Sequence, residues 1–141
     1  MILLSPSLRE QITAAAEAAY PAECCGLLTG SGQTVTRTAP SPNVTEENAD
    51  NRFEVDPGLR FALMRELQKS GERIIGHYHS HPDRPARPSE YDRKMAFEPE
   101  LAWVIVSVIN GKAAGIAAFM ADGESNGFRE IELQITDSPM L

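Results

Sequence analysis

Apolar positions recur every three or four residues in parts of the chain, and this spacing is typical of amphipathic helices. Serine or aspartate followed by proline precedes two of these stretches, as expected for a helix start. The predicted helices are residues 6–20, a second that opens at Asp56-Pro57 and ends near Gly71, and a short one from Ser89 to Phe97.

Other stretches alternate apolar and polar residues, or are continuous β-prone runs, and both patterns predict strands. Asn110-Gly111 separates two such runs and is a dipeptide typical of a two-residue hairpin. Residues 39–52 look like a loop, and we expect a short strand, Arg52–Val55, at its end. The other predicted strands are Ile2–Leu4, Cys25–Gly30, Thr34–Thr38, Arg73–His79, Ala102–Ile109, Ala113–Met120 and Phe128–Thr136.

This order of elements predicts an α/β domain with a mixed or mostly antiparallel sheet covered by its helices. The chain has 141 residues, the size of one ordinary domain. No internal repeat, low-complexity tract or linker is visible. We therefore expect a single domain spanning residues 1–141.

Charge and composition exclude several classes of function. The net charge of −7 argues against nucleic acid as the main partner, because binding phosphates requires a basic surface. The longest apolar run is too short to span a membrane, and the first residues, MILLSPS, do not resemble a secretory signal. Cys24 and Cys25 are neighbours that would form a strained disulfide, so we expect free thiols in a reducing cytoplasm.

The segment from Gly76 to Asp92, GHYHSHPDRPARPSEYD, contains all three histidines of the chain at alternate positions. Residues two apart in a strand face the same side, so His79 and His81 can direct their imidazoles at one point. Hydrolytic zinc sites use three protein ligands and keep one position open, and Asp92 can supply the third. Such an ion lowers the pKa of its water from about 15.7 to about 7.

Simpler interpretations of this segment stay open. Many histidine pairs at this spacing bind no metal, and Ser89 with Asp92 also has the spacing of a helix-capping box. A carboxylate on zinc would be less free to cap the helix. Clustered histidines without partners would each cost roughly 1–3 kcal/mol, however, and a shared metal explains the cluster.

The sequence His79-Ser80-His81-Pro82, followed by Ser89-x-x-Asp92 with seven residues between His81 and Ser89, resembles the signature of the JAMM (MPN-plus) metalloprotease family. That family also places a glutamate before a Cys-Gly-containing strand, as in residues 21–30, PAECCGLLTG. The resemblance covers nearly the whole chain. It implies an α/β (α+β), cytidine-deaminase-like MPN/JAB domain, with a mixed, mostly antiparallel sheet flanked by about three helices.

The resemblance also implies roles for single residues. His79, His81 and Asp92 would bind one Zn²⁺ per chain. Glu23 would accept a proton from the zinc-bound water and pass it to the leaving amine, and Ser89 would hydrogen-bond the developing oxyanion or hold the water. Without the resemblance, Glu23 would be interpreted as a solvated residue before a strand.

His77 departs from the pattern, because the family commonly has an aromatic residue at this position. It lies two residues before His79 and is expected to face the same side. We expect His77 to line a pocket or to support a ligand rather than to bind the metal.

The compact bacterial members of this family are linked to ubiquitin-like sulfur-carrier proteins. The resemblance therefore implies a cytoplasmic zinc-dependent isopeptidase or peptidase that cleaves after the Gly-Gly tail of such a carrier or of its C-terminal adduct. Two alternatives are a hydrolase of small peptides or amides without a protein partner, and a non-catalytic MPN scaffold domain. A homodimer is left open, and neither nucleic acid nor membrane is expected as a partner.

Overall fold

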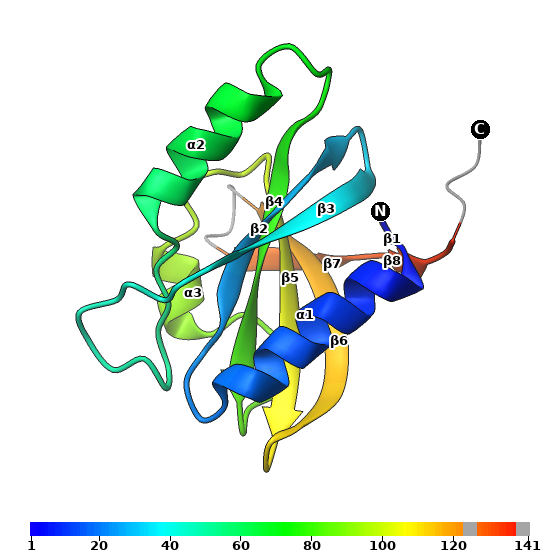
Figure 1. The fold of residues 1–141 in the computed structure, drawn as a ribbon. Coiled ribbons are helices and arrows are strands. Elements are labelled where there is room, and N and C mark those ends of the chain that lie inside the picture. Colours follow the sequence, from blue (N-terminus) through cyan, green and yellow to red (C-terminus); the bar gives the residue numbers. More distant parts are fainter. Residues whose placement is uncertain (123–126, 138–141) are drawn as a thin grey trace.

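In a computed structural model, which describes residues 1–122 and 127–137, eight strands form one sheet and three helices lie against it (Figure 1). Residues 123–126 and 138–141, which belong to the expected domain, lie outside the described part. The elements are β1 (Ile2–Leu4), α1 (Pro6–Ala19), β2 (Cys25–Ser31), β3 (Thr34–Ser41), α2 (Pro57–Leu67), β4 (Arg73–Pro82), α3 (Glu90–Lys94), β5 (Ala102–Ile109), β6 (Lys112–Asp122), β7 (Gly127–Ile131) and β8 (Leu133–Ile135).

The strand order is β7-β6-β5-β4-β2-β3-β1-β8, which places β4 at the centre of the sheet between β2 and β5. The pairings of β4 with β5 and of β1 with both β3 and β8 are parallel. The remaining pairings, β2 with β3 and β4 and β6 with β5 and β7, are antiparallel. The expected mixed, mostly antiparallel sheet is confirmed.

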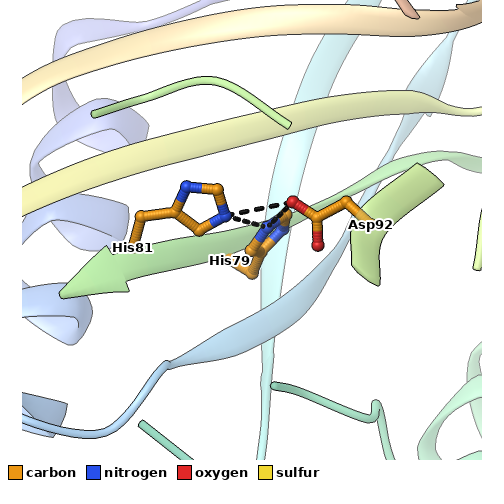
Figure 2. A group of neighbouring side chains, drawn as sticks. All are labelled: His79, His81 and Asp92. Atoms are coloured by element: carbon orange, nitrogen blue, oxygen red, sulfur yellow. Dashed lines mark hydrogen bonds and ion pairs between the residues drawn. The ribbon is translucent and has the colours of Figure 1, made fainter. Parts of the chain in front are cut away.

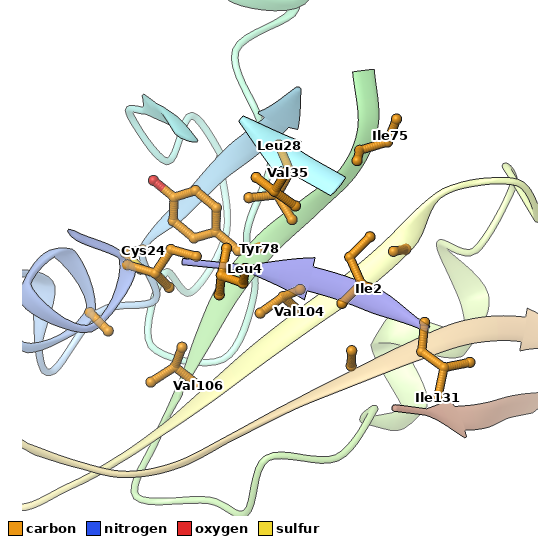
Figure 3. Packing of buried hydrophobic residues seen from close by; sticks show 14 of the residues in the cluster. Ile2, Leu4, Cys24, Leu28, Val35, Ile75, Tyr78, Val104, Val106 and Ile131 are labelled. Carbon is orange, nitrogen blue, oxygen red and sulfur yellow. The ribbon is translucent and has the colours of Figure 1, made fainter. Parts of the chain in front are cut away.

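Successive side chains of β4 point to opposite faces of the sheet. Tyr78 belongs to the core on one face, where Ile12 and Ala16 of α1 also pack. His77 and His79 point to the other face, where their rings neighbour Trp103. Figure 3 shows part of the core on the α1 side: Ile2, Leu4, Cys24, Leu28, Val35, Ile75, Tyr78, Val104, Val106 and Ile131.

The predicted helix starts and hairpin are confirmed. Ser5 Oγ accepts a hydrogen bond from the Leu8 N–H at 3.1 Å and caps α1. Asp56 caps α2 in the same way, through the Gly58 N–H at 3.0 Å. In the turn between β5 and β6, Asn110 and Gly111 have φ values of 51° and 84°, as a turn with two left-handed residues requires.

The predicted strand Arg52–Val55 is wrong. The described chain forms only an isolated antiparallel bridge there, between Asn43 and Val55. The Asn43 side chain accepts a hydrogen bond from the Glu54 N–H at 3.0 Å and donates one to the Arg52 carbonyl at 2.9 Å. These side-chain bonds use backbone groups that a strand ladder would need.

The predicted last strand, Phe128–Thr136, is divided at Glu132. Its first part, β7, pairs with β6 at one edge of the sheet, and its second part, β8, pairs with β1 at the opposite edge. The Glu132 carbonyl accepts a hydrogen bond from the Ile2 N–H at 2.9 Å. Because one residue joins the two edge strands, the sheet must curl until its edges approach each other.

The third helix is shorter than predicted and ends at Lys94 rather than at Phe97. Asp92 is its buried residue, and Phe97 is 76% exposed. Without an apolar face to bury, the segment after Lys94 has little to hold it in a helix.

None of the helices in the described part of the chain combines the length and the apolar character needed to cross a membrane.

Candidate metal centre

Three buried side chains converge beside the centre of the sheet (Figure 2). His79 and His81 leave the same face of β4, and Asp92 reaches them from α3. The two Nε2 atoms lie 3.1 Å apart, and Asp92 Oδ2 lies 3.2 Å from His79 Nε2 and 3.0 Å from His81 Nε2. All three residues are at most 2% exposed.

The proton on His81 can be assigned from its surroundings. Its Nδ1 lies 3.0 Å from the Pro85 carbonyl, which can only accept, so Nδ1 carries the hydrogen of the neutral ring. The Nε2 lone pair then faces Asp92 Oδ2. Burial disfavours the Asp92 carboxylate, but the neighbouring imidazoles and the Ser89 N–H outweigh it and lower the pKa of Asp92. In the tautomer with the hydrogen on Nδ1, which a metal ligand requires, two acceptor atoms face each other across a short gap, and a cation between them would stabilise this arrangement.

The spacing of these atoms fits a zinc ion. Zinc binds imidazole nitrogen and carboxylate oxygen at about 2.0–2.2 Å, which places tetrahedral ligand atoms about 3.3–3.6 Å from one another. The three observed separations, 3.0–3.2 Å, are slightly shorter than this. Two imidazoles and one carboxylate also form a donor set that suits this metal.

Ser89 and Asp92 form the capping box that their spacing predicts. Ser89 Oγ accepts a hydrogen bond from the Asp92 N–H at 3.0 Å, and Asp92 Oδ2 accepts one from the Ser89 N–H at 2.9 Å. The same Oδ2 faces the imidazoles, and a carboxylate oxygen has two lone pairs. The cap and a metal bond are thus compatible, and the cap fixes the carboxylate where a ligand is needed.

Glu23 is buried, with 2% exposure, so the interpretation as a solvated residue is wrong. Cys25 pairs with His79 in the ladder between β2 and β4, which brings Glu23 beside the end of β4. Glu23 Oε2 accepts a hydrogen bond from Arg84, whereas Oε1 is buried without a partner among the described residues. Burial raises the pKa of Glu23, and His79, His81 and Arg84 oppose this rise.

A loop that follows β3 holds Glu23 in place. The Glu23 N–H donates to the Ala49 carbonyl at 2.7 Å, and the Glu23 carbonyl accepts from the Asn43 side chain at 3.1 Å. Farther along, the Phe53 ring stacks on His79 with centroids 4.2 Å apart. The sequence analysis did not identify Asn43, Phe53 or Arg84 as part of the site. Phe53 is the one of the three with a visible signal, because it is an isolated aromatic residue in a polar segment.

His77 lies beside the three converging residues but outside their group. Its ring contacts Trp103 with centroids 4.3 Å apart, and its Nδ1 is buried without a hydrogen-bond partner in the described part of the chain. It lines a pocket of about 320 Å³ together with Leu27 of β2, Trp103 of β5, and both apolar and charged residues of other segments. The structure therefore places His77 in a pocket wall.

Comparison with known proteins gives a family match over most of the chain. Residues 5–122 match the family described as prokaryotic homologs of the JAB domain. A desampylase from Haloferax volcanii is 36% identical over 89 residues, 62% of this chain and 63% of that protein, so the match spans less than two thirds of the relative. A CysO-cysteine peptidase from Mycobacterium tuberculosis is 28% identical over 107 residues, 76% of this chain and 73% of that protein.

Solved structures resemble the chain over almost its full length. A protein from Desulfitobacterium hafniense superimposes with a TM-score of 0.83 at 32% identity, covering 98% of this chain and 94% of that one. A JAB1/MPN domain protein from Archaeoglobus fulgidus superimposes with a TM-score of 0.63 at 22% identity, covering 97% and 98%. The second likeness concerns the fold alone, and it agrees with the expected MPN/JAB architecture.

Proposed function

Since the chain belongs to the family of prokaryotic homologs of the JAB domain, we propose that it is a zinc-dependent peptidase or isopeptidase. Its substrate would be the bond that follows the Gly-Gly tail of a ubiquitin-like sulfur-carrier protein. The observation that carries this proposal is the convergence of two Nε2 atoms and one Oδ2 atom within 3.2 Å, with a buried glutamate nearby. The name of the mycobacterial relative, CysO-cysteine peptidase, supports the substrate class.

In this proposal His79, His81 and Asp92 hold one zinc ion per chain. The bound ion would supply Lewis acidity, lowering the pKa of a water and polarising the scissile carbonyl. The Pro85 carbonyl keeps the proton of His81 on Nδ1, so that Nε2 is free to act as a ligand. The Ser89 N–H orients Asp92 and, with the neighbouring imidazoles, lowers its pKa.

Glu23 is the proposed general base and acid. It would accept a proton from the attacking water and deliver it to the leaving amine. Burial raises the pKa of Glu23 above the ordinary carboxyl value, and Arg84 fixes one of its oxygens. The other oxygen, Oε1, is buried and unpartnered in the described structure and so is available for the proton.

Ser89 is proposed to stabilise charge on the substrate. Its Oγ accepts the cap bond from the Asp92 N–H, which leaves the hydroxyl hydrogen free to donate. A donor at this position would hydrogen-bond the carbonyl oxygen as negative charge develops there.

We further propose that residues 1–141 act as one domain in the cytoplasm, with a protein carrier as partner rather than nucleic acid or a membrane surface. The net charge of −7 supports this choice. The complete donor set argues against a non-catalytic scaffold, because such domains commonly lack the metal ligands.

The direct test uses a Gly-Gly-ended carrier joined through an amide bond to cysteine. We expect the zinc-loaded protein to release the free carrier, detected as a loss of mass, and removal of zinc by a chelator to stop the reaction. A protein that contains stoichiometric zinc and leaves the adduct intact would contradict the proposal. Equal rates on short unrelated peptides would favour the hydrolase without a protein partner.

A further inference from the structure

A second hollow lies next to the candidate metal centre, at the end of β4. It has a volume of about 320 Å³. Of the described residues that line it, three are arginines and none is acidic, although the chain carries a net charge of −7. The lining residues are His81, Arg84, Pro85, Arg87, Pro88, Ser89 and Arg93.

Three carboxylates near this hollow have other partners, and a fourth, Glu90, lines a neighbouring hollow together with Arg93. Glu23 accepts its bond from Arg84, and Asp92 faces the imidazoles. Asp83 accepts hydrogen bonds from the Tyr20 hydroxyl at 2.6 Å and from the Asn110 N–H at 2.9 Å. No acidic residue lines the hollow, and of its three arginines only Arg84 is in an ion pair between described residues, with Glu23.

Two of the three arginines are free to bind a ligand. Arg87 and Arg93 are exposed, and neither takes part in an ion pair between described residues. The third, Arg84, is shared with Glu23. Guanidinium groups bind carboxylates through two parallel hydrogen bonds, so this wall suits a carboxylate better than a neutral group.

The position of the hollow relative to Glu23 indicates which part of a substrate would occupy it. Glu23 is the group proposed to protonate the leaving amine, so the amine must depart on the side of Glu23. Arg84 contacts Glu23 and also lines the hollow. The pocket lined by His77 and Trp103 is a separate hollow, away from Arg84.

Resting on the proposed function, we propose that this hollow binds the α-carboxylate of the leaving group. The substrate is then a carrier joined to the α-amine of a free amino acid. In such an adduct the carboxylate carbon is two covalent bonds, roughly 2.5 Å, from the scissile nitrogen. A lysine side chain of a conjugated protein has no anion at that distance, so the hollow selects against isopeptide conjugates.

The reaction is a hydrolysis and balances without a further reactant. The oxygen of water bonds to the terminal carbonyl carbon of the carrier, and the C–N bond breaks. The proton taken by Glu23 goes to the departing nitrogen. The second proton of the water leaves the new carboxylic acid for the released amine or for solvent. The products are the carrier carboxylate and the free amino acid, whose carboxylate stays paired with Arg87 and Arg93 until release.

Two substrates with the same scissile bond test the inference: the carrier–cysteine adduct with a free carboxylate, and the same adduct with a carboxamide. We expect the zinc-loaded wild type to prefer the carboxylate by about tenfold or more in kcat/KM, as a charge-assisted pair implies. In the double variant Arg87→Ala/Arg93→Ala the preference should fall below about threefold, mainly because the KM for the carboxylate adduct rises. Arg9→Ala, which replaces an exposed arginine of α1, is the control and should keep the wild-type preference.

A binding measurement separates recognition from catalysis. Zinc-loaded Glu23→Gln should bind the intact carboxylate adduct in calorimetry, and adding Arg87→Ala should weaken that binding by about tenfold. Equal kcat/KM of the wild type for carboxylate and carboxamide adducts would overturn the inference and leave the proposed function standing. Failure to cleave either adduct would instead count against the proposed function.

Discussion

Arg84, in the segment after β4, donates a hydrogen bond to Oε2 of Glu23, 61 residues earlier in the chain. The arginine side chain is 31% exposed, whereas the glutamate side chain is 2% exposed. Arg84 is also anchored through its own backbone, because its carbonyl accepts a hydrogen bond from Ser107 Oγ at 2.5 Å. One cation at the rim thus fixes a buried carboxylate beside the candidate metal centre.

Replacing Arg84 should change how the rate depends on pH. Arg84 lowers the pKa of Glu23 against the rise caused by burial, so Arg84→Ala should raise that pKa further. A general base must be deprotonated, so the acid limb of the kcat/KM profile should move to higher pH, with a lower rate at neutral pH. Arg9→Ala should leave the limb unchanged, and a shift to lower pH in Arg84→Ala would contradict the assigned role.

Zinc content should separate His77 from the three proposed ligands. His79→Ala and Asp92→Asn each remove one donor from a buried site, so both should lose bound zinc in atomic spectroscopy. They should also lose zinc-dependent stabilisation, which is about 2.7 kcal/mol when free zinc is 100-fold above its Kd. His77→Phe should keep both properties. If it abolished zinc binding while His79→Ala did not, the ligand set would be wrong.

Ser89 has two roles that different substitutions can separate. Loss of an N-cap serine costs about 1 kcal/mol when alanine replaces it, but only a few tenths when glycine does. Ser89→Ala should therefore lower the free energy of unfolding more than Ser89→Gly. Turnover should fall equally in both, because neither variant has the hydroxyl donor. If turnover followed stability instead, Ser89 would act only as a helix cap.

The two thiols should be inert in the folded protein. Burial and the neighbouring Cys24 raise the pKa of Cys25 to about 12, and burial also raises that of Cys24. Only thiolates react with alkylating reagents, so neither cysteine should be modified at pH 8 in the native state. Both should react after denaturation in urea, which serves as the control. Rapid modification of the native protein would show that this part of the core opens.

Local patterns in the sequence predicted much of the candidate site. His79 and His81 share a face because strands have a period of two, and Asp92 follows after a short loop. The burial of Glu23 was not predictable in this way, since it depends on the Ala49 carbonyl and the Asn43 side chain in a loop that lacks periodicity. The Pro85 carbonyl that orients His81 is a backbone group and has no sequence signal.

The fold was predictable to a similar extent. Helix caps and the Asn110-Gly111 turn depend on neighbouring residues, and the structure confirms them. The break at Glu132 depends on pairing with β1 at the far edge, although alternation in the sequence continues through it. Such long-range pairing cannot be read from local spacing.

The most direct test of the central claim compares zinc-loaded wild type with Glu23→Gln on a Gly-Gly-ended carrier adduct. Glutamine keeps the shape of the side chain and an oxygen that can accept from Arg84, but it cannot take up a proton at neutral pH. We predict equal zinc content and a turnover about 10²–10⁴-fold lower in the variant. Equal turnover by the two proteins at equal zinc content would contradict the account.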